Sequence, residues 1–99
     1  MDNLNQDELI AHLNAQTGQI TWQELQPFFA KGALQYLATG YDLIDIATAL
    51  IRDDKLIILP LVEAKILGPL EDAKAKEIQM NDEFWAVVIA PWVLIQPKS

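Results

Sequence analysis

The sequence contains no cysteine, one histidine and one serine, which is the last residue. The absence of cysteine excludes disulfides, thiolate catalysis and cysteine-based zinc sites. A lone serine at the end of the chain does not form a nucleophile with a nearby base. Three of the glycines, Gly32, Gly40 and Gly68, are isolated, so they form no phosphate-binding loop. The sequence therefore predicts no catalytic residues, no metal ligands and no cofactor.

Positive charge is also scarce. Seven lysines and arginines stand against 14 aspartates and glutamates, which gives a net charge of −7. Nucleic-acid binding needs clustered positive charge, and anionic membranes repel an acidic protein. The longest apolar run, residues 84–95, contains Pro91 and is shorter than the roughly 20 residues of a membrane helix. The N-terminal residues lack the basic and apolar regions of a secretory signal. We expect a cytoplasmic protein with no nucleic-acid or membrane partner.

The most apolar stretch, residues 84–96, is apolar on both alternating faces. This pattern predicts a strand that is covered on both sides. Pro91 has no N–H to donate, so we expect a bulge or bend at Ala90–Pro91. Residues 84–90 would then lie centrally, and residues 92–96 would lie at an edge or pair with another chain.

Helices are predicted on both sides of the first glycine. Residues 6–16 have a narrow apolar stripe with acidic residues in the first turn. Thr21 and Glu24 form a capping-box pattern for a second helix over residues 22–31. A third helix is expected within residues 55–67. Because Pro60 disrupts a helix beyond its first turn, this helix either begins near Leu59 or is kinked there. Residues 70–80 are predicted to be a solvated helix or an extended arm.

The middle of the chain is ambiguous. Residues 33–38 suggest a strand, and residues 42–52 fit both an amphipathic helix and a strand. The short connection Thr39-Gly40-Tyr41 suits a hairpin, so we favour a strand over residues 42–52. With 99 residues and 52% hydrophobic content, we expect one domain over residues 1–99. The predicted fold is α+β, with a small antiparallel sheet of about three strands packed against N-terminal and central helices.

Six of the seven residues in the segment 56–62 are apolar, more than a short surface helix needs. The segment is either core or a contact surface. We favour a small non-enzymatic interaction domain that self-associates, as a dimer, through this segment or a sheet edge. The predicted interface residues are Leu56, Ile57, Leu59, Leu61, Trp92 and Leu94.

Two other functions are considered. The first is a small-molecule-binding protein or unrecognised enzyme with an aromatic-lined pocket, formed by Trp22, Tyr36, Trp85 and Trp92 and polarised by Asp42, Asp45 or Arg52. The second is binding of a hard cation by the aspartates around residues 42–54. Surface caps and turns are the simpler explanation for these carboxylates.

Several segments resemble the DUF2288 family of small bacterial proteins of unknown function. They are Trp22 to Pro27, Lys31 to Leu34, Asp42 to Asp45 leading to Arg52-Asp53-Asp54, and the ending Ile89 to Gln96. The resemblance covers residues 20–96 and is most specific at the apolar ending with its internal proline and final glutamine. It implies a bacterial cytosolic protein and brings no activity. The apolar segment 55–67 departs from the polar helix that the family pattern implies.

Overall fold

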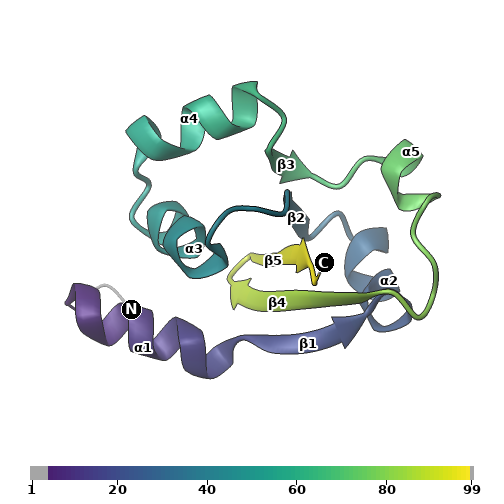
Figure 1. The fold of residues 1–99 in the computed structure, drawn as a ribbon, viewed down its shortest axis with the longest axis horizontal. Coiled ribbons are helices and arrows are strands. Elements are labelled where there is room, and N and C mark those ends of the chain that lie inside the picture. Colours follow the sequence, from purple (N-terminus) through teal and green to yellow (C-terminus); the bar gives the residue numbers. More distant parts are fainter. Residues whose placement is uncertain (1–4, 99) are drawn as a thin grey trace.

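The computed structural model describes residues 5–98, which form five helices and five strands (Figure 1). The helices are α1 (Gln6–Gln16), α2 (Trp22–Ala30), α3 (Leu43–Ile51), α4 (Lys55–Glu63) and α5 (Asp72–Ala75). The strands are β1 (Gly18–Thr21), β2 (Leu34–Leu37), β3 (Leu67–Pro69), β4 (Glu83–Ile89) and β5 (Trp92–Pro97). The predicted α+β class is confirmed.

The strands form one five-stranded sheet in the order β1-β4-β5-β2-β3. β2 and β5 are parallel, whereas the other three neighbouring pairs are antiparallel. The prediction of about three antiparallel strands therefore gave too few strands and missed the parallel pair. The parallel pairing joins residues about 60 positions apart, for example Leu34 with Val93. No local pattern indicates a pairing between such distant segments.

Residues 84–96 form two strands rather than one bent strand. β4 and β5 make a hairpin in which Ile89 pairs with Trp92, and Ala90–Pro91, joined by a cis peptide bond, is the two-residue turn. Pro91 thus stands where no ladder hydrogen bond is needed. The central position of residues 84–90 is confirmed. The expected edge position of residues 92–96 was wrong, because β5 lies between β4 and β2.

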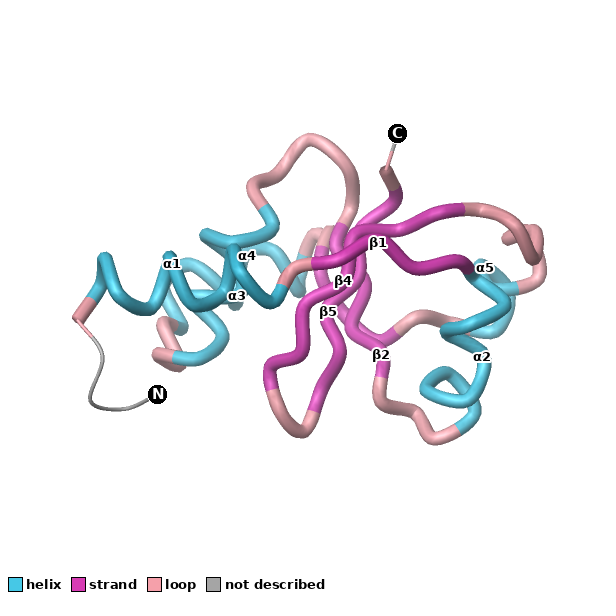
Figure 2. The backbone as a smooth tube through the Cα atoms, turned by 90° about the horizontal axis from the view of Figure 1, so that it is seen from below, coloured by secondary structure: helices cyan, strands magenta, loops and turns pink. Residues whose placement is uncertain are grey.

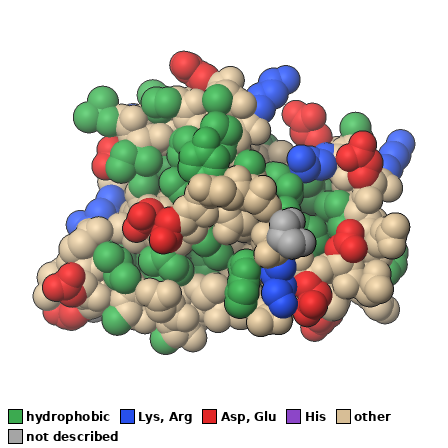
Figure 3. All heavy atoms as spheres, viewed as in Figure 1, with side chains coloured by type: hydrophobic (Ala, Val, Ile, Leu, Met, Phe, Trp, Pro, Cys, Tyr) green, Lys and Arg blue, Asp and Glu red, His purple; other side chains and the backbone are tan. Residues whose placement is uncertain are grey.

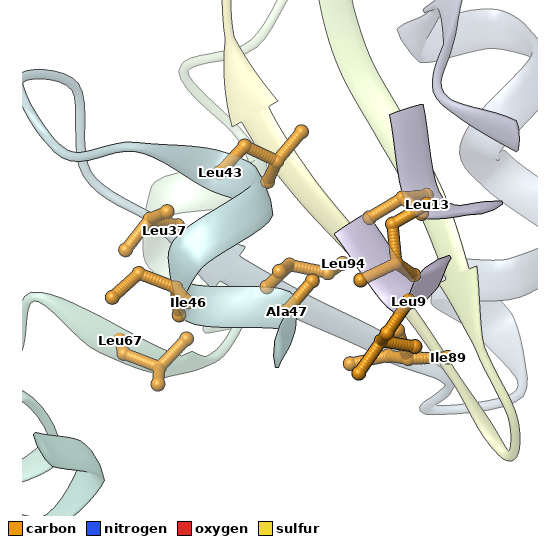
Figure 4. Packing of buried hydrophobic residues seen from close by; sticks show 10 residues of the cluster. Leu9, Leu13, Leu37, Leu43, Ile46, Ala47, Leu67, Ile89 and Leu94 are labelled. Carbon is orange, nitrogen blue, oxygen red and sulfur yellow. The ribbon is translucent and has the colours of Figure 1, made fainter. Parts of the chain in front are cut away.

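Helices cover both faces of the sheet (Figure 2). Alternate residues of β4 and β5 point to opposite sides, so Val87 and Leu94 belong to one core cluster and Phe84 and Ile95 to another. The first cluster includes α1 and α3, as Figure 4 shows for Leu9, Leu13, Ile46 and Ala47 against the sheet residues. The second includes Trp22 and Leu25 of α2 and Ala75 of α5. The doubly apolar pattern of residues 84–96 is explained by this three-layer packing.

Residues 43–51 form helix α3, so the preference for a strand was wrong. The Asp42 side chain caps the helix by accepting hydrogen bonds from the amides of Ile44 and Asp45, at 2.9 and 3.0 Å. Leu43, Ile46 and Ala47 lie on the face buried against the sheet. An N-cap aspartate begins a helix because its carboxylate satisfies amides that have no partner within the helix.

Two predicted helices are confirmed, and two further predictions are confirmed in part. α1 matches the expected range, and α2 begins with both hydrogen bonds of the Thr21–Glu24 capping box. α4 starts at Lys55 rather than near Leu59, with Pro60 inside it. Within the stretch 70–80, the helix is limited to the four residues of α5. None of the helices formed by residues 5–98 is long and apolar enough to cross a membrane.

Gln96 connects the sheet to the loop that precedes α3. Its side chain is buried, and its Nε2 donates hydrogen bonds to the carbonyl oxygens of Ala38 at 2.9 Å and Tyr41 at 2.8 Å. Both carbonyls lie in the segment between β2 and α3. A side chain of the central strand thus fixes the path by which the chain leaves the sheet.

Candidate functional site

Helix α4 is the one long helix, among those the structure describes, in which no residue is fully buried. Ile58 and Leu61 pack partly against the core. The other four large apolar residues of α4 are more exposed: Leu56 is 91% exposed, Leu59 52%, Ile57 46% and Val62 45%. Figure 3 shows hydrophobic side chains gathered over the region of α4. An exposed apolar patch of this kind is typical of an interaction surface.

Pro60 is compatible with α4 because the helix is exposed. Proline at the sixth helical position removes the amide that would bond to the carbonyl of Leu56. Leu56 is 91% exposed, so a water molecule can donate the hydrogen bond to its carbonyl oxygen instead. This limits the free-energy penalty of the missing amide. A proline in this position is easier to accommodate in a surface helix than in a core helix.

Charged residues stand at both ends of α4. Asp53 and Lys55 lie at its start, and Glu63 and Lys65 at its end. Lys55 Nζ is 4.0 Å from Asp53 Oδ2, and both side chains are more than two-thirds exposed. Such an exposed pair contributes little to stability. These four side chains remain accessible to a partner that lies along the helix.

The predicted interface residues separate into three groups. Leu56, Ile57 and Leu59 are exposed on α4, while Leu61 of the same helix packs partly against the core. Trp92 is 41% exposed but lies at the start of β5, in the hairpin. Leu94 is fully buried in the central strand, so the structure corrects its assignment to a contact surface. We call the exposed residues Leu56, Ile57, Leu59 and Val62 the α4 surface.

The predicted aromatic pocket is not assembled. Trp22 is buried in the core, 5.4 Å from Phe29 and 6.3 Å from Phe84 between ring centroids. Tyr36 packs against the α2 side of the sheet and Trp85 against the α1 and α3 side, so the sheet lies between them. Asp42 caps the start of α3 and Arg52 its end, and Asp45 is exposed in its first turn. The residues of the predicted pocket therefore lie in different parts of the fold and do not face one another.

The aspartates around α3 do not gather into a cation site. Within residues 5–98, no three histidine or carboxylate side chains lie close enough to hold a metal ion. Asp42 uses its carboxylate to cap the helix, and Asp53 lies beside Lys55. These contacts agree with the simpler explanation of caps and turns.

A hollow at the β3 edge of the sheet was not expected from the sequence. Its volume is about 420 Å³, and it is lined by Tyr36 of β2, Val62 of α4, Lys65, Leu70 and Lys74, among others. A second hollow of about 330 Å³ shares Tyr36 and Lys74 with the first. The sequence gives no signal that Lys65 and Lys74 share a site. They meet at one hollow only because of the path of strand β3 and the turns around it.

Comparison with known proteins identifies similar sequences and a similar fold. A family model described as "Protein of unknown function (DUF2288)" matches residues 8–97. The NMR solution structure of PA1075 from Pseudomonas aeruginosa has 38% sequence identity and a TM-score of 0.80, covering 100% of this chain and 92% of that chain. No curated protein matches the sequence.

Proposed function

The chain belongs to the DUF2288 family, which has no described function, and from that premise we propose that it is a non-enzymatic interaction domain that forms a homodimer through the α4 surface. The observation that carries this proposal is the exposure of four large apolar side chains on one short helix. Complete burial of a leucine or isoleucine side chain contributes about 1.5–3 kcal/mol. A partner that covers the helix face of Leu56, Leu59 and Val62 would recover part of that free energy at each of these three positions.

The order of charges along α4 favours a second copy of the chain as the partner. Leu59 is the centre of the exposed segment. Lys55 and Glu63 lie four residues before and after it, and Asp53 and Lys65 lie six residues before and after it. In a symmetric dimer, the same surface of both subunits meets across a two-fold axis. If this axis passes near Leu59 at right angles to α4, the two helices run antiparallel and each of these charges faces one of opposite sign.

The apolar residues follow the same symmetry. Leu56 and Val62 lie three residues on either side of Leu59, and both are exposed. Antiparallel packing would therefore place Leu56 of each copy near Val62 of the other, with Leu59 against Leu59. A small interface with an apolar centre and charged ends has the general composition of a protein–protein contact.

Analytical ultracentrifugation of wild-type protein and Leu59→Asp tests this proposal. We expect a dimer for the wild type at about 100 µM, in the range where weak to moderate complexes form. Leu59→Asp places two carboxylates together at the axis and should give a monomer with an unchanged circular dichroism spectrum. Met80→Asp is the matched control, because Met80 is 55% exposed and lies outside α4.

Charge reversal separates this arrangement from general hydrophobic association. Lys55→Glu should weaken the dimer because it places two glutamates opposite each other, and the pair Lys55→Glu with Glu63→Lys should restore it. A wild-type protein that is monomeric at this concentration contradicts the proposal. A dimer that survives Leu59→Asp would place the interface elsewhere.

A further inference from the structure

We infer that the hollow between β3, α4 and α5 is a binding site for a small organic anion with an apolar body. Its volume of about 420 Å³ falls within the range of small-molecule sites, roughly 300–1,000 Å³. The base and walls are largely apolar and include Val62, Leu67, Pro69 and Leu70. The hollow adjoins the proposed dimer contact, because Val62 and Lys65 take part in both.

Two lysines give the hollow its charge. Lys65 and Lys74 line it together with one carboxylate, Glu71, so its charged lining is two positive groups against one negative. This local balance is opposite to that of the whole chain, whose net charge is −7. Among residues 5–98, the ion pairs use Lys55 and Lys98, so neither lining lysine has a carboxylate within 4.0 Å. Both ammonium groups can therefore bond to an anionic ligand.

Tyr36 positions one of these ammonium groups. Lys74 Nζ lies 4.6 Å from the centroid of the Tyr36 ring, within the range of a cation–π contact. The ring and Lys74 line both neighbouring hollows, so together they form the wall between the two. The second hollow is lined by three carboxylates, Glu77, Asp82 and Glu83, against two lysines, Lys74 and Lys98, so its negative charge balance disfavours an anion. This difference assigns the anion to the first hollow.

The geometry defines the ligand class. A carboxylate or sulfonate would lie between Lys65 and Lys74, and a short aliphatic or aromatic body would cover the apolar residues of β3 and Leu70. On the face shown in Figure 3, hydrophobic side chains on the side toward α5 lie recessed among lysines and carboxylates. A small anion suits the site better than a polymeric one, because there are only two basic groups and both line a single hollow.

Hexanoate is a suitable probe, and its binding can be followed by titration of ¹⁵N-labelled protein in NMR spectra. We expect saturable shifts at the amides of Tyr36, Gly68 and Lys74, which line the hollow. Hexylammonium and hexanol have the same apolar body without the negative charge and should leave these amides unchanged at equal concentration. Equal shifts with all three probes would overturn the inference, as would hexanoate shifts confined to the α4 surface.

Substitutions test the role of each lysine. Lys65→Gln and Lys74→Gln should each raise the dissociation constant for hexanoate about tenfold, as expected for the loss of one charge-assisted contact. Lys76→Gln is the control, because Lys76 is exposed near α5 and does not line the hollow. An unchanged dissociation constant in both lining variants would overturn the inference. Leu59→Asp should bind hexanoate as the wild type does, so the result does not depend on dimer formation.

Discussion

The buried carboxamide of Gln96 holds the loop between β2 and α3. Replacing it with methionine, of similar length, leaves the carbonyls of Ala38 and Tyr41 without their donor. A buried polar group that loses its partner destabilises the folded state by about 1–3 kcal/mol. We therefore expect Gln96→Met to lower the free energy of unfolding by that amount, measured by urea denaturation.

Gln19→Met provides the control for this change. Gln19 is exposed in β1 and accepts a hydrogen bond from Lys98 Nζ at 3.0 Å. Surface substitutions of this kind change stability by less than about 0.5 kcal/mol. If Gln96→Met and Gln19→Met have equal effects, the Gln96 hydrogen bonds do not stabilise the loop.

At the scale of elements, α3 and α4 begin with the same residue type but differ in capping. Asp42 accepts two amide hydrogen bonds at the start of α3, whereas the Asp54 side chain makes no capping hydrogen bond at the start of α4. Loss of a capping aspartate lowers stability by about 1 kcal/mol. Asp42→Ala should have this effect, and Asp54→Ala should change the free energy of unfolding by less than half as much, measured by urea denaturation. Equal losses of unfolding free energy would show that both aspartates act through the helix dipole rather than through capping hydrogen bonds.

The helices with clear end signals could be predicted from the sequence. The Thr21–Glu24 pattern placed α2 within one residue at its C-terminal end, and the acidic first turn placed α1. Asp42 carries the same kind of signal for α3. The prediction failed there because the Thr39-Gly40-Tyr41 connection also suited a hairpin. The relevant capping residue was present, but a competing local pattern was given more weight.

The sheet was harder to predict because its pairings are distant or its strands are short. β1 has four residues and β3 three, too few for a visible alternation of apolar and polar side chains. Ala90–Pro91 provides a turn inside an uninterrupted apolar run, so one strand was expected where two exist. The lysine-lined hollow depends on these same features, since β3 forms its edge.

For the segment 56–62, the sequence left two alternatives open, a core helix or an exposed contact surface. The structure shows the exposed helix α4.

At the scale of the whole molecule, net charge opposes the proposed dimer. Two copies with a charge of −7 each would approach to about the shortest extent of the chain, 25 Å. Treated as point charges in water, they repel by about 8 kcal/mol without salt. Screening reduces this to about 3–4 kcal/mol at 0.01 M salt and below about 1 kcal/mol at 0.1 M. The local pairs between Lys55 and Glu63 of the partner subunit are exposed and contribute about 0–1 kcal/mol each.

Dimerisation through the α4 surface should therefore become stronger as salt is added. Between about 0.01 M and 0.1 M sodium chloride, the loss of repulsion corresponds to a dimer dissociation constant at least about tenfold lower. Sedimentation equilibrium at both salt concentrations measures this change, and Leu59→Asp should remain monomeric at each. A dissociation constant that rises with salt would mean that the charges at the ends of α4, rather than its apolar residues, hold the subunits together. The charge pairs would then determine the affinity of the dimer as well as its orientation. In that case Lys55→Glu would abolish the dimer, whereas Leu56→Ala would only weaken it.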